Sequence, residues 1–270
     1  MSVRPWPRPD IHERELPRPA ARWTSMASMT SLHAFCASRG DVAKSCRNCG
    51  AREFNVCQAL DAVQQEKLLA LASRLPLAKR DRLFSAGDPA RYVYNLTEGM
   101  VCLSRSLPDG RRQILGFLLP GDFIGFEADD IHRRDAEALT EAKVCRFERA
   151  AFDGFLRDNP DVALRLLQMA SGDLEQAARH EVLLGRKTAV ERLATFLLDL
   201  RDRSGARHLR THPLALPMTR GEIADYTGLT IETVSRTLRR LKADEVIELV
   251  GTGAVRVLDD DRLERLSGST

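Results

Sequence analysis

Long apolar segments are missing from this sequence of 270 residues. No apolar run approaches the roughly 20 residues that a helix needs to cross a bilayer. Residues 1–23 are rich in Pro and Arg and lack the apolar core of a signal peptide, so we expect a cytoplasmic protein with no membrane partner. The sequence also lacks a nucleophile paired with a general base and a glycine-rich loop that could cradle phosphate. We therefore do not expect an enzyme.

A strong excess of one charge is also absent. The chain has 41 Lys and Arg against 38 Asp and Glu, a formal net charge of +3, so the charge of the whole chain does not indicate a nucleic-acid partner. Any basic surface has to come from local clustering. With 43% apolar residues, the chain can bury one large core or two smaller ones, and its length favours two domains.

The six cysteines favour metal or redox chemistry, because disulfides are rare in a reducing compartment. Cys46, Cys49 and Cys57 follow a C-x2-C-x7-C pattern in a loop that contains Gly and Asn. Close spacing of this kind lets the three thiols converge on one soft metal centre. Three ligands are an incomplete set. The spacing alone does not distinguish zinc from an iron–sulfur centre or from three unligated thiols.

Residues 218–243 predict two short helices joined by a tight turn. Thr219 and Glu222 fit a capping box at the start of the first helix. Gly228 can adopt the left-handed conformation that ends this helix, and Thr230 then caps the second one. The spacing is typical of a helix-turn-helix, although a helical hairpin with an exposed basic face also fits it.

The second of these helices, predicted over 231–242, carries polar side chains suited to DNA. Its first turns would read base edges and its later turns would hold phosphate. The polar residues are Glu232, Ser235, Arg236, Arg239 and Arg240.

The helix pair resembles the DNA-reading part of the CRP/FNR family of transcription regulators, and Glu232-x2-Ser235-Arg236 resembles the signature of its FNR branch. The resemblance implies contacts with double-stranded DNA at a palindrome whose half-site resembles TTGAT. Ile231 stands where the cyclic-AMP-responsive branch carries another arginine, so the half-site of that branch is not expected. The DNA-binding residues implied are Thr219, Thr230, Glu232, Ser235, Arg236 and Arg239.

Residues 75–150 contain short β segments separated by Gly-Asp, Pro-Asp-Gly and Pro-Gly-Asp turns, which predicts an antiparallel roll or barrel. This segment resembles the β-roll of cyclic-nucleotide-binding domains. Nucleotide-responsive members carry Gly-Glu for the ribose and Arg-Ser or Arg-Thr for the phosphate, whereas this chain has Gly125-Phe126 and Arg134-Asp135. A carboxylate at the phosphate site would repel the ligand, so no cyclic nucleotide is expected.

Resemblance to the FNR branch decides which metal centre we expect. In these proteins an N-terminal loop of three cysteines joins a fourth from the sensor domain to hold an oxygen-labile [4Fe-4S] cluster. The segment AKVCRFER supplies the matching fourth cysteine, while Cys36 and Cys102 are not expected to be ligands. The cluster ligands implied are Cys46, Cys49, Cys57 and Cys145.

A long helix is predicted to begin after Asn159-Pro160 and to reach Gly185. The residues along one stripe of this helix are spaced alternately three and four apart, as a two-stranded coiled coil requires. This spacing predicts a homodimer. The alternative is a helix that lies on its own β-roll. Glu181 would face its own copy in a parallel dimer, which makes association marginal and therefore switchable. The predicted seam is Leu167, Ala170, Leu174, Ala177, Glu181 and Leu184.

The sequence therefore predicts an α+β protein with an antiparallel β-roll, a long dimerisation helix and a C-terminal winged helix-turn-helix. We also expect a single helix over 59–74, a capping box at Thr188 and Glu191, and a wing hairpin around Gly251. The predicted boundaries are a disordered arm at 1–40, a cysteine loop at 41–58, a sensor domain at 59–158, a dimerisation helix at 159–187 and a DNA-binding domain at 188–270.

The family resemblance implies an oxygen-responsive regulator of anaerobic or microaerobic genes. It would bind DNA as a dimer while the cluster is intact, and would contact RNA polymerase at promoters that it activates. The alternative is the same fold with a structural zinc or with no cluster, binding DNA constitutively or in response to another signal.

Overall fold

The computed structural model describes residue 46 and residues 49–268. The predicted arm at 1–40 and Cys36 lie outside the described residues. Among those described, no helix is both long and apolar enough to span a membrane.

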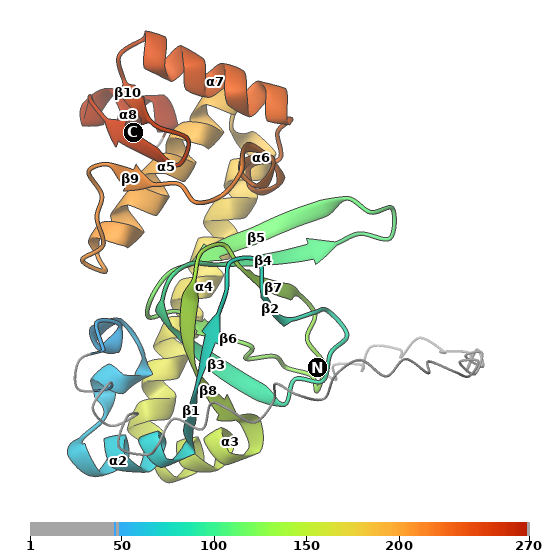
Figure 1. The fold of residues 1–270 in the computed structure, drawn as a ribbon, viewed down its shortest axis with the longest axis vertical. Coiled ribbons are helices and arrows are strands. Elements are labelled where there is room, and N and C mark those ends of the chain that lie inside the picture. The colour runs from blue at the N-terminus through green and yellow to red at the C-terminus, as the bar shows by residue number, and fades with distance from the viewer. Residues whose placement is uncertain (1–45, 47–48, 269–270) are drawn as a thin grey trace, which may run out of the picture. The chain divides into compact units, whose positions relative to one another are not determined.

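A β-roll of two antiparallel sheets occupies the first part of the described chain (Figure 1). The strand orders are β1-β8-β3-β6 and β2-β7-β4-β5. The strands are β1 (Ala72–Leu77), β2 (Arg82–Phe84), β3 (Tyr92–Glu98), β4 (Val101–Ser106), β5 (Arg112–Leu118), β6 (Phe123–Ile124), β7 (Asp135–Ala138) and β8 (Ala142–Glu148). Two 3-10 helices and three α-helices flank them: η1 (Arg52–Phe54), η2 (Val56–Ala59), α2 (Ala62–Leu71), α3 (Arg149–Asp158) and α4 (Pro160–Arg186).

Alternation along β8 explains how one strand serves two cores. Val144 faces the core between the two sheets, together with Leu96 and Val101. The next residue, Cys145, points to the opposite face, because successive side chains of a strand alternate. It packs there in a second core with Phe152 of α3 and residues of η2, α2 and α4. This alternation directs the thiol of Cys145 toward the cysteine loop.

The single helix predicted over 59–74 is wrong at both ends. Asp61 forms the capping box that starts α2, and α2 ends at Leu71. Ala72 to Arg74 instead pair with residues 145–147 of β8. The spacing of apolar residues remains typical of a helix up to Arg74. Pairing with the buried strand β8 nevertheless satisfies the backbone hydrogen-bonding groups of these residues and outweighs that local preference. The short strands β2, β6 and β7 and the helix α3 were not predicted.

The C-terminal part of the described chain is a winged helix-turn-helix. Its elements are α5 (Ala189–Gly205), β9 (Leu214–Ala215), α6 (Arg220–Thr227), α7 (Ile231–Ala243), β10 (Ile247–Val250), β11 (Ala254–Val257) and α8 (Asp260–Ser267). The predicted capping boxes of α5 and α6 are both confirmed. The predicted wing is the β10-β11 hairpin, and β9 adds a third strand.

The helix α4 leads from the β-roll toward α5 (Figure 1). It begins at Pro160, one residue before the predicted start, and ends at Arg186, one residue beyond the predicted end. Val162, Leu166 and Leu183 on one side are buried within the chain. The predicted seam lies mainly in solvent: Leu167 is 65% exposed and Leu174 is 73% exposed. The helix therefore packs on its own β-roll and still leaves an apolar stripe uncovered in the single chain.

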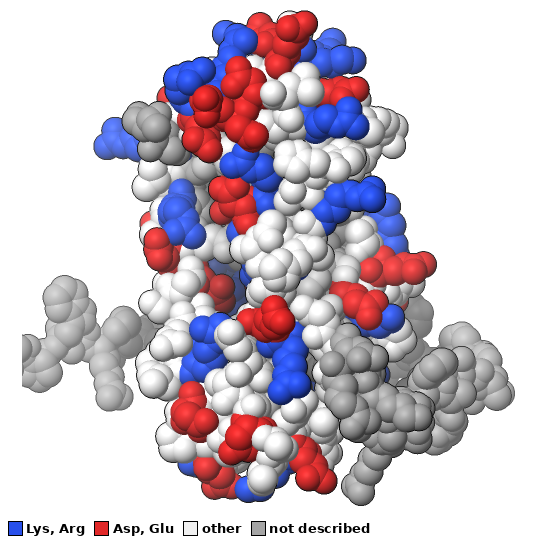
Figure 2. Space-filling model, turned by 90° about the vertical axis from the view of Figure 1, so that its left-hand side faces the viewer, with Lys and Arg blue, Asp and Glu red and all other residues white. Residues whose placement is uncertain are grey.

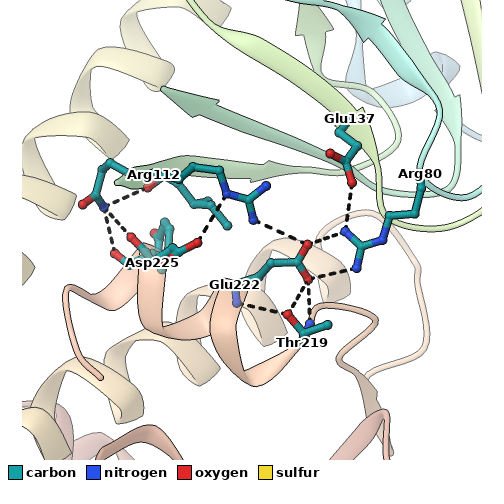
Figure 3. Close-up of polar contacts among 9 residues, drawn as sticks. Arg80, Arg112, Glu137, Thr219, Glu222 and Asp225 are labelled. Atoms are coloured by element: carbon teal, nitrogen blue, oxygen red, sulfur yellow. Dashed lines mark hydrogen bonds and ion pairs between the residues drawn. The ribbon is translucent and has the colours of Figure 1, made fainter. Parts of the chain in front are cut away.

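A polar cluster joins the β-roll to α6 (Figure 3). The buried carboxylate of Glu222 accepts a hydrogen bond from Arg80 Nη1 at 2.5 Å, and Arg80 also donates to Glu137 at 2.9 Å. Arg112 Nε lies 3.3 Å from Asp225 Oδ2. These contacts attach the first helix of the helix-turn-helix to two segments of the β-roll.

Candidate functional site

The helix-turn-helix forms where local sequence signals predicted it. Gly228 has a φ of 63°, the left-handed conformation that ends α6, and the amide of Leu229 donates back to the carbonyl of Ala224 at 3.1 Å. Ile223 and Val234 are fully buried between the two helices. The turn and this shared core fix the direction in which α7 projects.

The outer face of α7 carries the predicted DNA-reading residues. Glu232, Arg236 and Arg239 are exposed, and Ser235 is half-buried. Arg239 Nε donates to the carbonyl of Ser235 at 3.3 Å, within its own helix. All four side chains lie on one helix and at its surface, which is the arrangement that reading a DNA groove requires.

The two predicted threonines hold the ends of the helices. Thr219 Oγ1 accepts the amide of Glu222 at 3.1 Å, and Thr230 Oγ1 accepts the amide of Thr233 at 3.2 Å. Both threonines are exposed. They orient the helix N-termini, where unpaired backbone amides favour phosphate.

Charges of both signs are mixed on one face of the molecule (Figure 2). Figure 2 shows Lys and Arg interspersed with Asp and Glu over the face in view, as expected from a net charge of +3. Electrostatic attraction to DNA therefore depends on the local cations of α7.

The second candidate site is a cavity lined by four cysteines. Cys46, Cys49 and Cys57 come from the N-terminal loop and Cys145 from β8. Cys145 is far from the other three in the sequence, but β8 directs its side chain toward the loop. The other cavity walls are mostly apolar, including Leu68 of α2. The structure thus brings together the four cysteines that the family resemblance named.

The thiols in this cavity are close enough to influence one another. Burial, followed by repulsion from Cys145, Cys46 and Cys49, raises the pKa of Cys57 to about 12. Burial and the neighbouring thiols likewise raise the pKa of Cys145 to about 12. These two thiols carry protons at neutral pH in the metal-free protein. Because a metal binds thiolate, loading the site must release protons.

Two arginines lie beside the cysteines and were not predicted. Burial and repulsion from Cys49 raise the pKa of Cys46. Arg74 acts to lower this pKa through its charge and a hydrogen bond, and Arg52 acts to lower it through its charge. Arg52 also lines the cavity. Cations at this position stabilise thiolates against proton binding.

The donor set suits a sulfur-ligated centre. Four thiols are donors that zinc and iron–sulfur centres prefer, and the adjacent cations favour the thiolate form. As the side chains stand, no three His, Cys, Asp or Glu within residues 46 and 49–268 are grouped around a point where one metal ion would sit. Cys102 is buried in the core that β4 and β5 share with α5, away from the cavity.

The segment that resembles a nucleotide-binding cassette is occupied by the chain's own contacts. Arg134 Nη2 donates at 3.2 Å to Glu127, whose side chain is buried. Asp135 accepts the amide of Ala86 at 3.0 Å. We expected Asp135 to repel a phosphate, but the carboxylate that meets Arg134 is Glu127. Glu127 was not predicted, because nothing in the local sequence marks it as the partner of Arg134.

Comparison with known proteins finds relatives over most of the chain. The nitrogen fixation regulation protein FixK of Bradyrhizobium diazoefficiens is 40% identical over 83% of this chain and 94% of its own length. The transcriptional activator protein FnrL of Cereibacter sphaeroides is 37% identical over 83% and 92%. The structure of FixK2 from Bradyrhizobium japonicum superimposes with a TM-score of 0.69 at 38% identity, covering 74% of this chain and 98% of that one.

A β-roll sensor domain, a long helix and a winged helix-turn-helix define a class of DNA-binding transcription regulators rather than enzymes. The cyclic nucleotide-binding domain model matches residues 74–159 and the Crp-like helix-turn-helix domain model matches residues 191–266. The chain belongs to the CRP/FNR family, and it is a DNA-binding regulator of the FNR/FixK type. Members of this family are dimers.

Proposed function

We propose that this protein is an oxygen-responsive transcription activator that binds a palindromic TTGAT-type DNA site as a homodimer while a [4Fe-4S] cluster is intact. The observation that carries the proposal is the convergence of Cys46, Cys49, Cys57 and Cys145 on one cavity. The names of two relatives support it, the activator FnrL and the fumarate and nitrate reduction regulatory protein of Escherichia coli, which is 30% identical over 86% of this chain.

In this proposal the four cysteines hold the cluster as thiolates. Arg52 and Arg74 offset part of the negative charge that the four sulfurs bring together, and the apolar walls limit access of water. A [4Fe-4S] cluster bound there supplies sensitivity to oxygen.

The exposed stripe of α4 supplies the dimer contact in this account. Leu167 and Leu174 would be covered by the same residues of a second copy, since a symmetric dimer buries one patch twice. A dimer presents two copies of α7, and two recognition helices match the two halves of a palindrome. Activation further implies a contact with RNA polymerase, for which the loop Pro108–Gly110 of the β-roll is a candidate by resemblance.

Anaerobic purification of the wild-type chain tests the proposal. We expect a broad absorbance at about 400 nm that bleaches in air, with iron and acid-labile sulfide in equal amounts. Replacing Cys46, Cys49, Cys57 or Cys145 with Ala should abolish the absorbance, whereas Cys102→Ala, as the matched control, should retain it. A colourless wild-type protein with one zinc per chain would instead establish the alternative, a regulator with the same fold and a structural zinc.

A further inference from the structure

Two buried asparagines line the same cavity as the four cysteines. Asn55 is 0% exposed and Asn95 is 2% exposed, and both belong to the cavity wall. Each has an amide atom that makes no hydrogen bond within the described residues: Nδ2 of Asn55 and Oδ1 of Asn95. A buried polar group without a partner destabilises the folded state. Two such groups at one cavity indicate that their partner binds there.

The position of Asn55 is fixed by its other amide atom. Its Oδ1 accepts the backbone amide of Cys57 at 2.7 Å and caps η2. The rotamer that makes this cap also fixes the position of Nδ2, and Asn55 belongs to the cavity wall. Asn55 therefore brings an N–H donor, unpartnered within the described chain, to the residues that line the cavity.

Asn95 reaches the cavity from the sheet. It lies on β3 directly opposite Cys145 of β8 in the antiparallel register, so its side chain and the Cys145 thiol share one face. Oxygen and nitrogen of an amide occupy nearly the same positions and exchange on a half-turn of the terminal torsion. Asn95 can therefore also present an N–H to sulfur.

We propose that Asn55 and Asn95 donate hydrogen bonds to sulfur atoms of the iron–sulfur centre and thereby set its reduction potential. This inference rests on the proposed function, since it needs a sulfur-rich occupant. Hydrogen bonds to sulfur stabilise the more electron-rich, reduced form of the centre and raise its potential. Loss of a donor should lower the potential and make the centre easier to oxidise.

Water is the competing occupant. The cavity has a volume of about 30 Å³, which is enough for one or two water molecules. A bound water could satisfy both amides, and the asparagines would then have no influence on the cluster. The small volume also means that the cavity has to widen when a cluster is loaded.

The test compares midpoint potentials of the full-length protein loaded under anoxia. Asn55→Ser keeps a side-chain oxygen that can cap η2 and removes the amide donor; Asn95→Leu removes the second amide at similar volume. We expect the midpoint potential of each variant to be more negative than that of wild type. The expected shift is about 59 mV, which corresponds to a tenfold change in the equilibrium constant of a one-electron reduction. Bleaching in air should be several-fold faster.

Asn159→Ala is the matched control. Asn159 is also a buried asparagine, but its Nδ2 donates to the carbonyl of Phe155 at 2.7 Å, outside the cavity. This variant loses a buried hydrogen bond and should keep the wild-type potential. A second readout uses the metal-free protein, in which Asn95→Leu should melt no lower than wild type, because the unpaired acceptor is gone. The increase in melting temperature on cluster loading should be smaller in Asn95→Leu than in wild type.

The outcomes separate the two claims. If wild-type protein forms no cluster under anoxia, the proposed function and this inference both fail. If wild type forms a cluster and both asparagine variants keep its potential and bleaching rate, only the inference is overturned, and water satisfies the amides. Should Asn55→Ser fail to load a cluster, Asn95→Leu, which leaves the loop unchanged, decides the question.

Discussion

Arg80 of the β-roll donates a hydrogen bond to Glu222 of α6 at 2.5 Å, between residues 142 positions apart in the sequence. The same carboxylate accepts the amide of Thr219 at 2.7 Å and so completes the capping box of α6. One buried side chain thus serves both the start of the helix-turn-helix and its attachment to the sensor domain (Figure 3).

Arg80→Ala should destabilise the protein by about 1–2 kcal/mol, because it removes the nearer cation of the Glu222 carboxylate and leaves it Arg112, at 3.7 Å, and the Thr219 contacts. The Arg80 side chain is 42% exposed, so water screens part of the interaction and limits the loss. Urea unfolding measures this. The control is Arg111→Ala, which removes an exposed pair with Asp109 and should cost under about 0.5 kcal/mol; equal losses would contradict the role of Arg80.

Acid should weaken the same contact. Burial acts to raise the pKa of Glu222, but hydrogen bonds from Arg80 and Thr219 outweigh it and hold the pKa below its usual 4.5. The stability from this lowered pKa is therefore present above about pH 4.5 and is lost as the pH falls through the folded-state pKa. Glu222→Gln can still form a capping box. It should be less stable than wild type at pH 7, and it should lose less stability than wild type as the pH falls from 7 through the folded-state pKa of Glu222. Parallel pH profiles would contradict the assignment.

Arg236→Ala should weaken binding to the palindrome by about 1–3 kcal/mol and relax discrimination at one base pair. The reason is that an exposed guanidinium in the first turns of α7 is placed to contact a base edge. Binding is measured against a set of sites with single substitutions. A uniform loss across all sequences would reassign Arg236 to a phosphate contact. Arg240→Ala, changed on a later turn of the same helix, should give that uniform loss.

Glu181→Leu should dimerise without a cluster, since it replaces a like-charge contact in the predicted seam with an apolar one. Sedimentation of the metal-free protein measures this. The matched control is Glu175→Leu, because Glu175 is also exposed on α4 but pairs with Arg179 and lies off the seam. A metal-free Glu181→Leu protein that stays monomeric would end the proposal of a charge-limited seam.

The parts of the fold with local signals were predictable from the sequence. Thr219 and Glu222 lie three residues apart, and their capping box follows from side-chain chemistry alone. The overextended helix at 59–74 failed because Arg74 pairs with Cys145 in the sheet, and pairing with a distant strand leaves no trace in local periodicity. For the same reason the sequence predicted neither the partner of Arg80 nor that of Arg134.

The cysteine site was predictable only in part. Spacing connected Cys46, Cys49 and Cys57, whereas Cys145 came from family resemblance, since its proximity depends on the register of β8. Asn55 and Asn95 gave no signal at all. They stand out only because each has an amide atom without a hydrogen-bond partner in the described part of the chain, and hydrogen-bond partners can be identified only in the folded chain.

The most direct test of the whole account is DNA affinity measured during controlled exposure to air. Protein prepared under anoxia is titrated with a TTGAT-type palindrome while the absorbance at about 400 nm is followed. We expect tight binding before exposure, and loss of binding in step with the loss of absorbance. A colourless, metal-free preparation made under strict anoxia that binds the palindrome just as tightly would contradict it.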